Sequence, residues 1–185
     1  MPPLDAALLG ALALPLFAAH NLADHPLQSS AWAAAKGQCD HEGRLACAKH
    51  IAVVVVLQAV AVAVVVALTD TAVSPAAVVL GLAFTAWSHY WFDRRFTAAG
   101  LYQALGKTGF AKLGTPRPGH EDAPHLGTGA YRMDQDWHIL WLALSGLIIA
   151  SSGLILTVLA SLATMLMVAS IIVSRVGRRA LDQEA

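Results

Sequence analysis

The chain has 185 residues, of which 57% are hydrophobic and only 13% are charged, whereas an ordinary soluble domain carries roughly 25% charged residues. Its 12 basic and 12 acidic residues cancel, so the composition gives no electrostatic basis for binding nucleic acid. Length and composition together predict one transmembrane domain over residues 1–185, built as an all-α integral membrane helical bundle.

The first half of the chain contains two apolar runs. Residues 4–24 are long enough to cross a bilayer as a helix, which takes about 20 residues. No positive charge precedes this run, as it would in a secretory signal, so we expect it to stay as a span. A polar connection over residues 29–48 leads to a valine-rich run at 50–68. Its unbroken apolar length favours a second transmembrane helix over a strand.

The second half predicts three further spans. The third covers residues 75–96 and ends in aromatic residues and arginines, which is typical of a membrane interface. Residues 97–132 are the only long polar segment and are expected to form a cytoplasmic loop; the role of its part between His120 and His125 stays open. The uncharged stretch 138–173 is too long for one crossing at about 1.5 Å per residue. We therefore divide it at residues 151–153 into spans at 134–150 and 154–174.

The distribution of lysine and arginine favours five spans over four. With five spans, all 12 basic residues fall on one side, which the positive-inside rule makes the cytoplasmic side. With four, the short basic tail at 175–185 would lie outside. We therefore predict a protein of the cytoplasmic (inner) membrane with its N-terminus outside and its C-terminus inside.

Ionisable residues recur at the predicted cytoplasmic ends of the spans. Three histidine–aspartate pairs have a spacing of four residues, which places both members on one helix face, and one further histidine opens the second span. The seven residues are His20, Asp24, His50, His89, Asp93, Asp134 and His138. Such groups are costly in a membrane and usually functional.

Histidine and aspartate together indicate a metal site. Imidazole and carboxylate suit zinc, manganese or iron, and helical bundles build dimetal sites from side chains on facing helices. The sequence therefore predicts one or two divalent ions, with zinc as the first choice and manganese or iron as alternatives.

Two other interpretations stay open. An ion or proton path also uses Asp and His, but it should have polar groups through the full depth of the membrane. The second, fourth and fifth spans are apolar beyond their cytoplasmic ends, with Gln58 as the main exception, which gives such a path little support. A structural network would more typically use Ser, Thr, Asn or Gln. The corresponding functions are a metal-ion or small-solute transporter and a non-catalytic structural or interaction protein.

The order of the polar motifs is more specific than any one of them. HxxxDxxxQ begins at His20, HxxxDR begins at His89, and DQxxH begins at Asp134, with Lys36 and His50 between the first two. Over about residues 8–150 this order resembles a family of small bacterial and phage integral membrane proteins catalogued as a domain of unknown function. That family is distantly similar to membrane-bound metal-dependent hydrolases.

The resemblance implies a membrane-embedded metal-dependent hydrolase. The seven residues would be metal ligands, with Asp134 as a ligand or general base. Lys49 and Arg94 are further candidate catalytic residues that would neutralise an anion as charge develops. The residues expected to support the ligands or contact the substrate are Gln28, Lys36 and Gln135. The depth of the site suggests a membrane lipid or a lipid-like or phosphorylated small molecule as substrate; the oligomeric state stays open.

Overall fold

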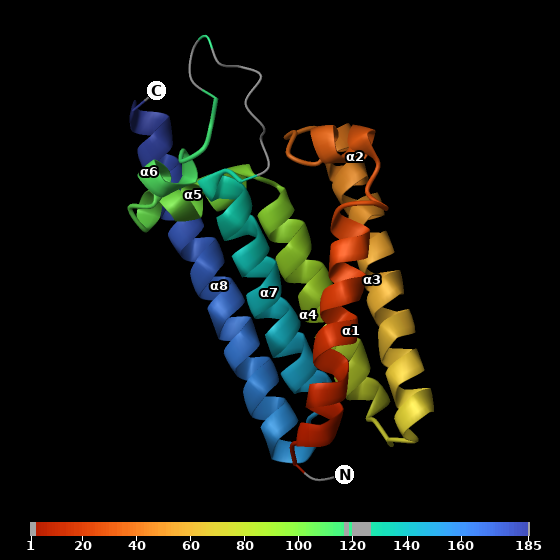
Figure 1. The fold of residues 1–185 in the computed structure, drawn as a ribbon. Helices are drawn as coiled ribbons and strands as arrows, with labels where there is room; N and C mark the ends of the chain where they lie inside the picture. Colours follow the sequence, from red (N-terminus) through yellow and green to blue (C-terminus); the bar gives the residue numbers. More distant parts are fainter. Residues whose placement is uncertain (1–2, 117–118, 120–126, 185) are drawn as a thin grey trace.

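The computed structural model describes residues 3–116, 119 and 127–184 (Figure 1). Within this part the chain is all-α, as predicted, and no strand is present apart from a single bridge between Leu4 and Ser151. The helices are α1 (Ala6–Asp24), α2 (Ser30–Ala35), α3 (His41–Thr69), α4 (Pro75–Asp93), α5 (Phe96–Ala104), α6 (Thr108–Ala111), α7 (Gly129–Ile149) and α8 (Gly153–Glu184). The segment from His120 to His125 lies outside the described residues.

The long helices α1, α3, α4, α7 and α8 run side by side, and each overlaps one of the five predicted spans (Figure 1). The short helices α2, α5 and α6 gather with the C-terminus at one end of the bundle, and the N-terminus lies at the other end. Helices α1, α3 and α8 are long and apolar enough to cross a membrane. The number of crossings and their direction stay predictions.

Large apolar side chains cover the outer faces of the longest helices. On α3 these exposed residues include Val56, Val60 and Leu68, and on α8 they include Leu154 and Met165. A contiguous apolar surface of this kind marks a region that contacts lipid or another protein. The fold is therefore that of an integral membrane helical bundle.

Three helices are longer than the apolar pattern predicts: α3, α8 and α7, which begins at Gly129 and not at residue 134. Helix α3 begins at His41, because the Asp40 side chain accepts a hydrogen bond from the Gly43 backbone N–H at 2.7 Å and caps the helix. Helix α8 continues through the basic tail to Glu184. Helical hydrogen bonds form in polar and apolar surroundings alike, so hydropathy marks the apolar part of a helix and not its ends.

The predicted turn between the last two long helices is present, and the N-terminal segment is fastened to it. The Asp5 backbone N–H donates to the Ala150 carbonyl at 2.8 Å, and the Ser152 N–H donates to the Pro3 carbonyl at 3.0 Å. These bonds satisfy backbone groups at the end of α7 and hold the start of α1 beside the turn.

At the opposite end, α5 packs closely on α8. A Cβ added to Gly177 would lie 1.8 Å from the Gly100 carbonyl oxygen, so the two backbones can approach only because both residues are glycine. The Ser174 hydroxyl donates to the Thr97 carbonyl at 2.6 Å across the same contact. This packing fixes α5 over the end of the bundle that holds the polar cluster.

Candidate metal centre

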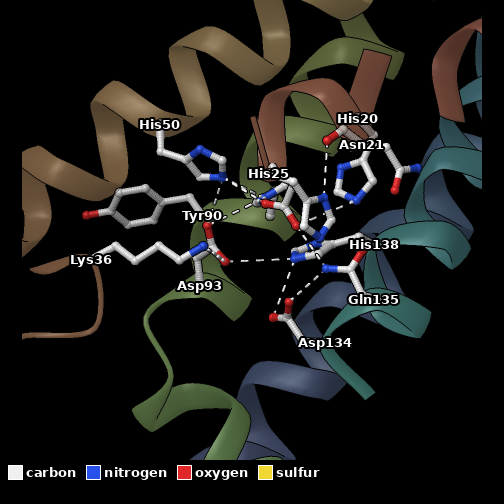
Figure 2. Close-up of polar contacts among 12 residues, drawn as sticks. His20, Asn21, His25, Lys36, His50, Tyr90, Asp93, Asp134, Gln135 and His138 are labelled. Carbon is white, nitrogen blue, oxygen red and sulfur yellow. Dashed lines mark hydrogen bonds and ion pairs between the residues drawn. The ribbon is translucent and has the colours of Figure 1, made fainter. Parts of the chain in front are cut away.

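The seven predicted ligand residues converge from four helices, and Figure 2 labels His20, His50, Asp93, Asp134 and His138 among them. Helix α1 supplies His20 and Asp24, and α3 supplies His50. Helix α4 supplies two more residues and α7 the last two. Six of the seven are buried, with Asp24 the most accessible of them at 9%, whereas Asp134 is partly exposed. The prediction that these side chains meet is therefore confirmed by the geometry, while their role as ligands stays a prediction.

Four of the residues form a compact group around His50. The Nε2 atom of His50 lies 3.1 Å from Asp24 Oδ1 and 3.2 Å from His89 Nε2. It also lies 3.4 Å from Asp93 Oδ2. The Nε2 atom of His89 lies 3.4 Å from each of the same two carboxylate oxygens. Two imidazole nitrogens and two carboxylate oxygens thus face a common centre.

These separations have the size expected around a tetrahedral ion. Bonds of about 2.0–2.1 Å to nitrogen and oxygen place tetrahedral ligands about 3.3–3.4 Å apart, and the five distances run from 3.1 to 3.4 Å. Asp93 Oδ2 is also buried without a hydrogen-bond partner among the described residues. A buried carboxylate oxygen that accepts no hydrogen bond is costly, and a cation bound between it and the two histidines would remove that cost.

A second group lies beside the first. The ligand atoms of Asp24, Asp134 and His138 all lie within 4.8 Å of one another, with His138 Nε2 3.5 Å from Asp134 Oδ1. The His20 ring is 5.2 Å from the His138 ring between centroids, and its Nε2 lies 4.0 Å from Asp24 Oδ2. The His89 and His138 rings stack at 3.8 Å and join the two groups.

Lys36 and Gln135 contact the carboxylates directly. Lys36 Nζ lies 2.9 Å from Asp93 Oδ1, which leaves Oδ2 facing the histidines. Burial disfavours the charged form of Lys36, but the carboxylates of Asp93 and Asp24 outweigh it and raise the pKa, so this amine is protonated at neutral pH. The Gln135 amide donates to Asp24 Oδ2 at 2.8 Å and to Asp134 Oδ2 at 3.3 Å.

The structure does not bring Lys49 and Arg94 to the cluster. Lys49 is exposed on α3. The Arg94 guanidinium donates to the Gln38 carbonyl and lies over the rings of Tyr90 and Phe96. Adjacent residues of a helix point about 100° apart, so Lys49 does not share the direction of His50, and Arg94 lies just beyond the end of α4, in the turn that follows it. Their catalytic roles stay predictions that the geometry does not support.

A pocket of about 650 Å³ reaches the cluster from the end of the bundle where α5 lies. Its polar lining includes Asp24, Asp93, Asp134, Gln135, Lys36 and Gln28. The Gln28 amide nitrogen is buried without a hydrogen-bond partner in the described part of the chain. This pocket gives the carboxylate side of the cluster access to small molecules.

Sequence reasoning missed three further pocket residues, Arg95, Tyr102 and Tyr131. Arg95 donates to the Ala33 carbonyl at 2.7 Å, and the Tyr131 hydroxyl lies 2.7 Å from His25 Nε2. Tyr131 precedes Asp134 by three residues, so helical spacing could have placed it beside the site. No sequence signal shows that α5 folds over the cluster and brings Tyr102 with it.

An apolar helical bundle with a largely buried cluster of four histidines and three aspartates defines a class: a helical membrane protein with a candidate metal-binding centre. The chain belongs to the family described as "Protein of unknown function (DUF3307)", whose model matches residues 12–168. This confirms the resemblance to a family of unknown function. No curated protein and no solved structure matches the chain.

Proposed function

We propose that this protein is a membrane-embedded metal-dependent hydrolase that acts on an amphiphilic substrate carrying a phosphate or a similar anion. The observation that carries the proposal is the cluster of histidines and aspartates at the pocket: the separations around His50 fit a tetrahedral ion, and Asp24 and Asp134 of the adjoining group line the pocket. A divalent ion supplies a Lewis acid and lowers the pKa of a bound water towards about 7.

The pocket supports the substrate class. It has alanine and aromatic walls, including Ala98, Ala99 and Phe92, and it carries Lys36 and Arg95 as cations. Apolar walls suit a hydrocarbon portion, and cations suit an anionic group. Asp134 lines the pocket and is partly exposed, which suits a carboxylate that either binds an ion or accepts a proton from a water there.

The charge distribution supports a location for the site. In the described part of the chain, the segments that contain the basic residues lie at the same end of the bundle as the pocket (Figure 1). By the positive-inside rule this end would face the cytoplasm. We therefore propose that the substrate enters from the inner leaflet of the cytoplasmic membrane.

The test uses the full chain purified in detergent. Metal content is measured first, and hydrolysis is then assayed on phosphatidic acid, a lysophospholipid and a soluble aryl phosphate, before and after chelation and after addition of Zn²⁺ or Mn²⁺. We expect chelation to abolish release of product and the metal to restore it. The His89→Gln variant should be inactive and His41→Ala, an exposed histidine on α3, should be active. A preparation that binds metal but cleaves none of these substrates would refute the hydrolase and leave the metal centre standing.

A further inference from the structure

We propose that a second divalent cation binds beside the first, held by Asp24, Asp134 and His138, and that this second ion is the one that faces the pocket. The inference rests on the proposed metal centre, because the two sites share Asp24. It assigns different tasks to the two ions.

The four-ligand group is closed. An ion held by two histidines and two aspartates in tetrahedral geometry has no free position, as in structural metal sites, whereas catalytic sites keep one position open for water or substrate. Its two aspartates line the pocket, but with four ligands no position stays open towards it, and the histidines, His50 at 0% and His89 at 2% exposure, do not line it. An ion at this place would hold three helices together and would not meet the substrate.

The second group differs in the number of its ligands and in the partial exposure of Asp134. It offers three ligands, which leaves an open position, and two of them, Asp24 and Asp134, line the pocket. The third, His138, is 2% exposed, and its Nε2 is buried without a hydrogen-bond partner in the described part of the chain. A nitrogen buried next to carboxylates and left without a partner is well placed to bind a cation.

Asp24 connects the two groups. Its Oδ1 faces His50 and His89, and its Oδ2 faces the side of His20. A carboxylate that binds one ion through each oxygen suits the separation of about 3.5–4 Å found in two-metal sites. The Gln135 hydrogen bond to Oδ2 is compatible with this, because each carboxylate oxygen has more than one lone pair.

The donor sets also distinguish the two ions. Two imidazoles with two carboxylates suit zinc, whereas one imidazole with two carboxylates is richer in oxygen and suits manganese. His20 stands next to this second group with both ring nitrogens buried and without hydrogen-bond partners among the described residues. It is the nearest additional nitrogen for an ion that requires more than three ligands.

The experiment measures stoichiometry and not activity. The purified full chain is stripped with a chelator, loaded with ZnCl₂ and then MnCl₂, freed of excess metal and analysed by elemental analysis and electron paramagnetic resonance. We expect about two ions per chain, and a spin-coupled manganese signal when Mn²⁺ alone fills both sites. Asp134→Asn and His138→Gln should each lose one ion and retain the other, while Asp136→Asn, an exposed aspartate on the same helix, should retain both.

Each outcome decides the question. One ion per wild-type chain, with no change in Asp134→Asn, would overturn the second site and leave the first intact. No bound ion would refute the metal centre itself. The wild-type stoichiometry alone tests the second site if a variant fails to fold.

Discussion

Replacing His50 with alanine tests the four-ligand group most directly, because His50 is the only ligand from α3 and it is fully buried. Structural zinc sites bind with about 10–16 kcal/mol, so one ligand of four carries about 2.5–4 kcal/mol as an equal share. At about 1.4 kcal/mol per factor of ten, the dissociation constant for Zn²⁺ should rise roughly 10²–10³-fold.

The assay is a competition titration of the metal-free protein in detergent against a zinc chelator of known affinity. His41→Ala is the matched control, since it removes an exposed histidine from the first turn of the same helix. Circular dichroism establishes that both variants keep the helical content of the wild type. A dissociation constant for His50→Ala within about threefold of the wild-type value, with the fold retained, would contradict the assignment of His50 as a ligand.

Three further predictions concern stability and topology. Gly177→Ala places a methyl group against a carbonyl of α5 and should lower the free energy of unfolding by about 1–3 kcal/mol, measured by thermal unfolding in detergent. Gly10→Ala, at a position with open space around it, should leave the free energy of unfolding unchanged. Equal effects of the two substitutions would contradict the close contact. Lys36→Met leaves buried Asp93 without its cation and should lower the free energy of unfolding of the metal-free protein by about 3–5 kcal/mol. Lys107→Met, at an exposed site, is the control. An effect of Lys36→Met no larger than that of Lys107→Met would refute the ion pair between Lys36 and Asp93. A reporter fused to the C-terminus should be cytoplasmic, and an external reporter would exclude five spans in the predicted direction.

The residues that meet in the cluster were predictable because helical periodicity and the membrane act together. A spacing of four residues places His89 and Asp93 on one face of α4. Because exposing ionisable groups to lipid costs free energy, this face is oriented towards the protein interior. The alternation of span directions then sets the height of each pair. These three constraints need no knowledge of which helices are neighbours.

The same constraints fail where a residue lies outside the periodic pattern. Arg94 follows the ligand Asp93 in sequence, but it begins the turn after α4 and its side chain points to the Gln38 carbonyl. Tyr102 belongs to a short helix whose position depends on the contact between Gly100 and Gly177. Such contacts join segments far apart in the chain, and composition and periodicity do not reveal them.

The order of the ligands along the chain has a consequence for biogenesis. Asp24, His50, His89 and Asp93 all lie on α1, α3 and α4, so the four-ligand group is complete before the ribosome has made α7. Chains fold from the N-terminus onwards during synthesis, and an ion captured at that stage would tie the first three long helices into a preassembled unit. The fourth and fifth long helices would then dock against this unit, with α7 adding Asp134 and His138 as the last components.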